Sequence, residues 1–165
     1  MKVNGVKITK TLNKGFGVFA NRNFFKGEVV VYGRMVEVLP ERTAHSFQID
    51  ETTHVQLDKI SRTINHSCEP NMGIRNNILR AYDFIALRDI KKGEEITWDY
   101  ETTEYISIAV KTCLCNSRNC RRVLRGFKYR ANELLKKYGI YVADYLKLSV
   151  IGNKAIANVT LSIYD

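Results

Sequence analysis

The stretch that matters most for the fold is Arg62-Thr63-Ile64-Asn65-His66-Ser67-Cys68-Glu69-Pro70-Asn71. It contains one of the four cysteines of the chain. The other three follow in Cys113-Leu114-Cys115-Asn116-Ser117-Arg118-Asn119-Cys120, a short loop rich in small polar residues. Without an export signal, structural disulfides are not expected. Tetrahedral zinc takes thiolates from such a loop together with one from elsewhere, and Cys68 is the one remaining candidate.

The thiols therefore predict a zinc site made of Cys68, Cys113, Cys115 and Cys120, with unrelated free thiols as the alternative. A closed all-cysteine shell leaves no position open for water, so this zinc would be structural rather than catalytic. Zinc-finger peptides bind their metal with about 10–16 kcal/mol. Such a site would hold a C-terminal segment against the loop that carries Cys68.

Length and composition predict one globular domain. The chain has 165 residues, of which 45% are hydrophobic and 26% charged, which is an ordinary balance for a folded domain and excludes a disordered chain. No apolar run approaches the roughly 20 residues of a membrane span. The first residues also lack the apolar core of a signal peptide. We expect a soluble protein that is intracellular, in the cytoplasm or the nucleus, with no membrane partner and not secreted.

Charge is unevenly distributed along the chain. The formal net charge is +9, and nine bases against one acid lie between Lys111 and Lys137. This excess favours contact with nucleic acid through Arg118–Lys137. Between Glu94 and Glu104 there are five acids and no base, which favours a cationic ligand at that place. The alternative in both cases is a solvated charged face.

Hydrophobic periodicity predicts a mainly β fold with short C-terminal helices. Short apolar stretches, mostly alternating, dominate the first hundred residues. The predicted strands are Val3–Thr9, Val29–Val38, Phe47–Ile49, His54–Leu57, Ile78–Leu87 and Glu95–Tyr100. Helices are predicted over Ala131–Tyr138, with Gly139 as C-cap, and over Val142–Leu148. Alternation at Val159, Leu161 and Ile163 suggests one more strand.

Three motifs occur in a fixed order before the cysteine triplet. They are Lys14-Gly15-Phe16-Gly17-Val18, the Arg62–Asn71 stretch, and Gly93-Glu94-Glu95-Ile96-Thr97-Trp98-Asp99-Tyr100. A lone Gly-x-Gly is weak evidence, but the ordered set is specific. It resembles the SET-domain protein lysine methyltransferases, of the compact stand-alone type with a zinc-binding post-SET segment. The resemblance runs from about Val6 to Cys120.

The resemblance implies a fold and a division of the chain. The fold consists of small curved sheets, in which the Asn65–Asn71 loop and the final segment thread into a pseudoknot. The SET domain would span residues 1–110, the post-SET zinc segment residues 111–126, and a C-terminal extension residues 127–165. The methyl donor would be S-adenosylmethionine. The acceptor would be a lysine ε-amine of a basic protein, possibly a histone-like or nucleic-acid-associated one, and the two would meet through a narrow channel.

The resemblance also assigns roles to individual residues. Tyr100 matches the catalytic tyrosine, whose hydroxyl orients amine and methyl group. The residues that match cofactor contacts are Lys14, Gly15, Phe16, Gly17, Tyr32, Asn65, His66 and Tyr100. The substrate channel would include Trp98 and His45.

The implied chemistry requires a neutral amine. From an ordinary lysine pKa near 10.4, deprotonation at pH 7 costs about 4.6 kcal/mol. A desolvated channel with aromatic walls lowers that pKa, because burial disfavours the ammonium form. A tyrosine with a pKa near 10 acts at neutral pH as a hydrogen-bonding positioner rather than an anionic base.

Two positions depart from the family pattern. Trp98 stands where relatives often carry Phe or Tyr, and its bulk favours mono- or dimethylation over trimethylation. Ala44, His45 and Ser46 stand where relatives often place a channel tyrosine. Two other functions stay open: a non-catalytic, zinc-containing nucleic-acid-binding module that uses Arg118–Lys137, and an inactive SET fold that only binds lysine peptides.

Overall fold

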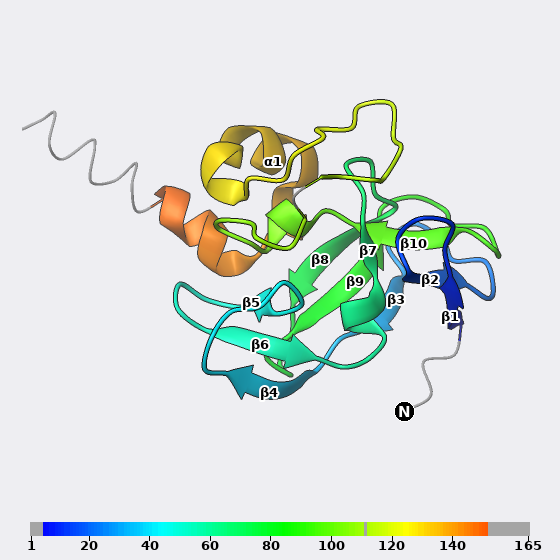
Figure 1. Cartoon of the computed structure of the whole chain (residues 1–165), viewed down its shortest axis with the longest axis horizontal. Helices are drawn as coiled ribbons and strands as arrows, with labels where there is room; N and C mark the ends of the chain where they lie inside the picture. Colours follow the sequence, from blue (N-terminus) through cyan, green and yellow to red (C-terminus); the bar gives the residue numbers. More distant parts are fainter. Residues whose placement is uncertain (1–4, 111, 152–165) are drawn as a thin grey trace, which may run out of the picture.

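The computed structural model describes residues 5–110 and 112–151, with the strands gathered in one half of the molecule and the helices packed beside them (Figure 1). In these residues ten strands form three small sheets. The prediction of a mainly β fold with short C-terminal helices is confirmed. No helix in the described ranges combines the length and apolar character needed to cross a membrane.

The first sheet joins three distant parts of the chain in the order β1-β2-β10-β7. Its strands are β1 (Val6–Lys10), β2 (Phe16–Ala20), β10 (Glu95–Trp98) and β7 (Asn65–His66). Neighbours are antiparallel except β10 and β7, which run parallel with Trp98 opposite His66. The Asn71 side chain extends this pairing, because it accepts from the Thr97 amide and donates to the Glu95 carbonyl, both at 2.9 Å.

The second and third sheets have three strands each. The second has the order β3-β9-β8, with β3 at Val29–Tyr32, β9 at Tyr82–Ala86 and β8 at Met72–Asn76. The third has the order β4-β6-β5, with β4 at Met35–Leu39, β6 at His54–Leu57 and β5 at Phe47–Gln48. All pairs within these two sheets are antiparallel.

The single strand predicted over Val29–Val38 is wrong, because the structure divides it between two sheets. The break falls at Gly33, whose amide donates to the Tyr82 carbonyl at 3.0 Å. A Cβ at this position would lie 2.4 Å from the same oxygen, so the close approach requires glycine. The next amide, that of Arg34, donates to an Asp58 carboxylate oxygen and turns the chain into β4.

Other strand predictions differ at their ends. The strand predicted from Ile78 begins at Tyr82, because Asn77 Oδ1 accepts the amides of Leu79 and Ala81 and closes a turn. The strand predicted to reach Tyr100 ends at Trp98. β2, β7 and β8 were not predicted. β8 carries consecutive buried residues, Met72 to Ile74, and so lacks the alternating pattern of a half-buried strand.

The C-terminal helices share the core of the sheets. Helix α1 (Ala131–Tyr138) has the predicted bounds, and Gly139 follows it with φ of +55°. The second helix covers residues 144–151, two residues later than predicted at its start. Leu134 and Leu146 are buried in the same cluster as Trp98. Four single turns of 3-10 helix, η1 (Ser61–Thr63), η2 (Tyr100–Thr102), η3 (Phe127–Tyr129) and η4 (Gly139–Tyr141), complete the elements.

The expected strand through Val159, Leu161 and Ile163 lies outside the described residues, as do Val3 and Asn4 of the first predicted strand.

Candidate active site and metal centre

The four cysteines come together from two distant loops. Their sulfur atoms all lie within 4.8 Å of one another, and the Sγ atoms of Cys68 and Cys113 are 3.9 Å apart. Four sulfurs bound to one zinc at about 2.3 Å lie about 3.8 Å apart. The backbone amides of Arg121 and Arg122 point at the sulfurs of Cys68 and Cys120, both at 3.4 Å, as suits thiolates. The donor set and its spacing therefore fit a structural zinc ion.

His66 connects this cluster with Tyr100. Its Nδ1 accepts the Tyr100 backbone amide at 3.2 Å, and its Nε2 lies 3.3 Å from the Cys68 sulfur. Burial, reinforced by nearby positive charges, lowers the His66 pKa to about 3, so the ring is neutral at pH 7. Because Nδ1 accepts, Nε2 carries the proton and donates to the sulfur. The imidazole therefore connects the start of η2 with the cysteine cluster.

Tyr100 is held in a fixed orientation with its phenol protonated. The hydroxyl donates to the Ile64 carbonyl at 2.9 Å. The ring packs on His66 and Trp98, with centroids at 5.3 and 4.8 Å. Burial, and secondarily the charge of Glu95, raise the pKa of Tyr100. The side chain can position a reacting group through its oxygen, but it is not an anionic base at neutral pH.

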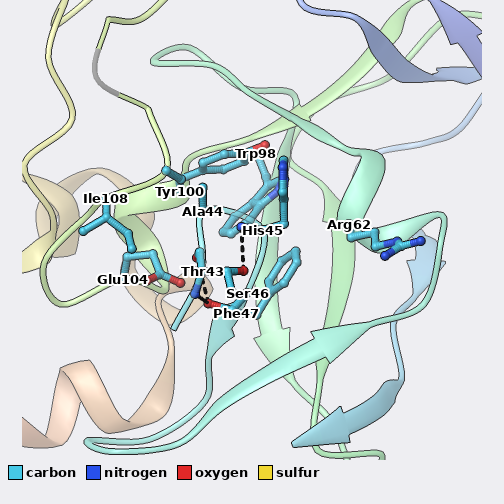
Figure 2. Close-up of a pocket in the computed structure, with 11 residues that line it drawn as sticks. Thr43, Ala44, His45, Ser46, Phe47, Arg62, Trp98, Tyr100, Glu104 and Ile108 are labelled. Carbon is cyan, nitrogen blue, oxygen red and sulfur yellow. Dashed lines mark hydrogen bonds between the residues drawn. The ribbon is translucent and has the colours of Figure 1, made fainter. Parts of the chain in front are cut away.

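Two cavities meet at Tyr100. The wide cavity, about 190 Å³, is lined by Lys14, Asn65, His66, Tyr100, Val110 and residues 112–115. The narrow cavity, about 30 Å³, is lined by the eleven residues drawn in Figure 2: Thr43, Ala44, His45, Ser46, Phe47, Arg62, Trp98, Tyr100, Glu104, Ile108 and Ala109. Tyr100 is the one residue common to the two sets. Tyr100 therefore lines both a space beside the aromatic core and a space beside the cysteine loop.

The wide cavity has groups that suit an amino acid. Lys14 Nζ lies 2.6 Å from Glu95 Oε2 and contributes a cation to the cavity wall. Asn65 uses its amide hydrogens on the Phe16 carbonyl at 3.0 Å and on Glu95 Oε1 at 2.9 Å. Its Oδ1 is thereby directed away from these partners and can accept from an ammonium group. The wall thus offers a cation for a carboxylate and an acceptor for an ammonium group.

Gly17 of the glycine motif leaves room for the side chain of Asn65. A Cβ at Gly17 would lie 2.8 Å from Asn65 Nδ2, so the absence of a side chain permits the hydrogen bonds of that amide. Gly15 has φ of +74° and closes the turn between β1 and β2. Phe16 is 63% exposed. Of the residues in this motif, Lys14 lines the wide cavity, whereas Gly15, Phe16 and Gly17 do not.

Two further predicted site residues lie apart from the centre. Tyr32 ends β3, in a different sheet from Asn65 and β10, and is 61% exposed. It lines neither of these two cavities. His45 lies on the exposed loop before β5 and lines the narrow cavity.

Aromatic rings form the floor of the narrow cavity. Phe47 stacks on Trp98 with centroids 5.6 Å apart, and Phe84 meets the same indole edge-on at 5.7 Å. The Trp98 Nε1 atom is buried and has no hydrogen-bond partner in the part of the chain that the structure describes. One carboxyl group, that of Glu104, lines this cavity and is 7% exposed.

Glu94–Glu104 is not a solvated charged face, because most of its acids are paired within the fold. Glu94 and Glu95 pair with Arg88 and Lys14 at 2.8 and 2.6 Å. Asp99 and Glu101 are fully buried and both pair with Arg121, at 2.6 and 2.9 Å. Because these partners come from other parts of the chain, a count of charges along the sequence could not find them.

Arg121 and Tyr138 connect the C-terminal segment to both sides of Tyr100. The Tyr138 hydroxyl donates to Asp99 Oδ2 at 2.9 Å, on the carboxylate that Arg121 also holds. Glu101 Oε1 accepts the amides of Arg125 and Gly126 at 2.6 and 2.7 Å. The sequence predicted Arg121 only as part of a basic segment, and Tyr138 only as the last residue of a helix.

Comparison with known proteins agrees with this geometry. The family profile described as "SET domain" matches residues 15–101, more than half of the chain. A variant-silencing SET domain-containing protein of Plasmodium falciparum is 32% identical over 162 residues, which cover 82% of this chain and 6% of that protein. A probable histone-lysine N-methyltransferase of Caenorhabditis elegans is 32% identical over 141 residues, covering 70% of this chain and 58% of that protein.

A third relative, the histone-lysine N-methyltransferase ash1 of Drosophila melanogaster, is 29% identical over 150 residues, which cover 79% of this chain and 7% of that protein. The chain thus spans less than two thirds of the length of each of these relatives. The profile match ends at Glu101, before the cysteine triplet. The chain belongs to the SET-domain family.

Proposed function

We propose that this chain is a protein-lysine N-methyltransferase that uses S-adenosylmethionine as methyl donor. The observation that carries the proposal is the position of Tyr100, which lines both cavities. A transfer between two substrates needs two binding spaces that meet at one oriented group. Such positioning can supply about 7–11 kcal/mol of the barrier reduction.

The wide cavity is the proposed site of the methyl donor. Lys14 binds the carboxylate of its methionine moiety, and Asn65 Oδ1 accepts from its ammonium group. The donor brings an activated methyl carbon on a sulfonium, so the protein has to align rather than activate. His66 and Tyr100 form the wall where the methyl group would lie.

The narrow cavity is the proposed site of the acceptor lysine. Its small volume and aromatic floor suit an unbranched methylene chain, and an amine that fills it would lose contact with water, which favours the neutral form. The indole of Trp98 fills space beside Tyr100 and limits the room for added methyl groups. We propose that mono- or dimethyllysine is the main product.

The metal has a structural role in this proposal. Cys113 and Cys115 line the wide cavity, so a zinc ion on the four thiolates would fix part of the wall against which the donor binds. The substrate is proposed to be a basic protein such as a histone, since two of the relatives described above are named histone-lysine methyltransferases. The enzyme would then act inside the cell, where such substrates occur.

The experiment is methyl transfer from labelled S-adenosylmethionine to core histones and unrelated basic proteins, with mass spectrometry of the labelled residues. Mono- or dimethyllysine in the wild-type reaction supports the proposal. Trimethyllysine as the main early product would contradict the role of Trp98. Salt-sensitive retardation of DNA without label transfer would favour a nucleic-acid-binding module that uses Arg118–Lys137.

A further inference from the structure

The narrow cavity contains a carboxyl group that the reaction outlined above does not use. Glu104 is 7% exposed and is the one acidic residue among the eleven that line this cavity. It follows η2, and its backbone amide donates to the Tyr100 carbonyl at 3.1 Å. In Figure 2 its side chain extends from the side of Ile108 toward the segment that carries Thr43. The group therefore lines the same cavity as Trp98 and Tyr100.

Glu104 is incompletely paired. Its Oε1 accepts the Gln48 backbone amide at 3.0 Å. Its Oε2 lies 3.8 Å from an Arg42 nitrogen that donates instead to the Ile106 carbonyl at 2.5 Å. A buried carboxylate without a close counter-charge is costly, and an incoming ammonium group would supply a charge-assisted hydrogen bond.

The pKa of Glu104 also suits proton transfer near neutral pH. Burial raises its pKa to about 7, against the opposing effects of the Gln48 amide and Arg42. The phenols of Tyr82 and Tyr145 lie within range of its charge, and both have raised pKa values, so neither ionises near pH 7. A proton acceptor is most effective when its pKa lies near the working pH.

We propose that Glu104 is a catalytic residue that binds the ε-ammonium group of the acceptor lysine and accepts its proton before methyl transfer. This inference rests on the proposed function. The N–H bond of the ammonium breaks and an O–H bond forms on Glu104, which leaves a neutral amine. The amine nitrogen then bonds to the methyl carbon as the carbon–sulfur bond of the donor breaks. Glu104 returns its proton to water when the product leaves.

The test compares the pH dependence of kcat/KM for the wild type and Glu104→Gln, with core histones as acceptor. In the wild type, kcat/KM rises as Glu104 ionises near pH 7 and is then level until free lysine loses its proton near pH 10.4. In Glu104→Gln it continues to rise toward the lysine pKa. At pH 7.5 the variant is slower by about 100-fold.

Two variants separate this effect from structure and from charge. Glu104→Asp keeps a carboxylate and is expected to keep the level region of the profile. Glu41→Gln removes the same charge from an exposed position in the segment before the cavity, and is expected to match the wild type. Thermal unfolding and donor binding, measured for each variant, show that the fold and the wide cavity are intact.

Two results would overturn the inference, and they differ from each other. An active wild type whose pH profile and rate Glu104→Gln reproduces would exclude Glu104 as proton acceptor and leave the proposed function standing. A wild type that transfers no methyl group to histones or other basic proteins would remove the proposed function, and the inference with it.

Discussion

Three buried carboxylates lie close to Tyr100 in the sequence, and the protein treats them in two ways. Asp99 and Glu101 are clamped by Arg121, and each has further donors from the C-terminal segment. Glu104 has one backbone amide and a distant guanidinium. Paired carboxylates fix the main chain on both sides of Tyr100, whereas the under-paired one faces a cavity. Burial alone does not therefore distinguish a structural charge from one available to a ligand; the number of its partners does.

The largest expected effect concerns the proposed zinc site. Removal of zinc with a chelator, or Cys68→Ser, should withdraw binding energy on the order of 10 kcal/mol and release the cysteine loop. Hydrogen exchange should then speed up in residues 112–130 and around His66, while the sheet formed by β4, β5 and β6 stays protected. A measured zinc content near zero in folded, fully protected wild-type protein would contradict the proposed metal site.

The next effect concerns the ion pairs that Arg121 makes with Asp99 and Glu101. Arg121→Met should destabilise the fold by about 3–5 kcal/mol, because it leaves two buried carboxylates without their shared cation. Arg118→Met removes the same charge from an exposed position of the same loop and should change stability by less than about 0.5 kcal/mol. Denaturant unfolding of both proteins makes the comparison. Equal stabilities would show that the ion pairs of Arg121 contribute nothing to the stability of the fold.

Removing the charge of Glu104 should stabilise the protein at high pH, whereas removing that of Arg121 destabilises it. The folded-state pKa is raised above the unfolded value near 4.5, so the native state holds a proton that the unfolded state has released. The stability of the wild type should therefore fall as pH rises from about 4.5 to about 7, by roughly 2–3 kcal/mol. Glu104→Gln should lack this fall and exceed the wild type at pH 8. Parallel pH–stability curves would show that Glu104 is not buried as a poorly paired acid.

The smallest effect concerns the hydrogen bond from Tyr138 of α1 to Asp99. Tyr138→Phe removes a hydrogen bond to Asp99 and should cost about 1.5 kcal/mol. Tyr129→Phe, on a half-exposed tyrosine of η3, is the matched control and should cost almost nothing. If both substitutions are neutral in thermal unfolding, α1 is attached by packing alone.

The sequence predicted the parts of the site that depend on local chemistry. The cysteine spacing indicated which sulfurs gather, and the helix signals of Ala131–Tyr138 predicted that element to the residue. The division of Val29–Val38 at Gly33 could not be predicted, because it depends on the Tyr82 carbonyl almost fifty residues later. The pairing of the acidic stretch could not be predicted for the same reason, since Arg121 and Arg130 reach it only in the folded chain. Long-range pairing thus decides which charges remain free.

The central claim is that Tyr100 joins two binding spaces, and Tyr100→Phe tests it most directly when donor binding and methyl transfer are measured on the same zinc-loaded protein. Phenylalanine keeps the ring between His66 and Trp98 and removes only the hydroxyl. Calorimetry should show S-adenosylmethionine bound about as tightly as by the wild type, while transfer to core histones falls by about 100-fold or more. Undiminished transfer by the variant, or a wild type with no affinity for the donor, would contradict the account.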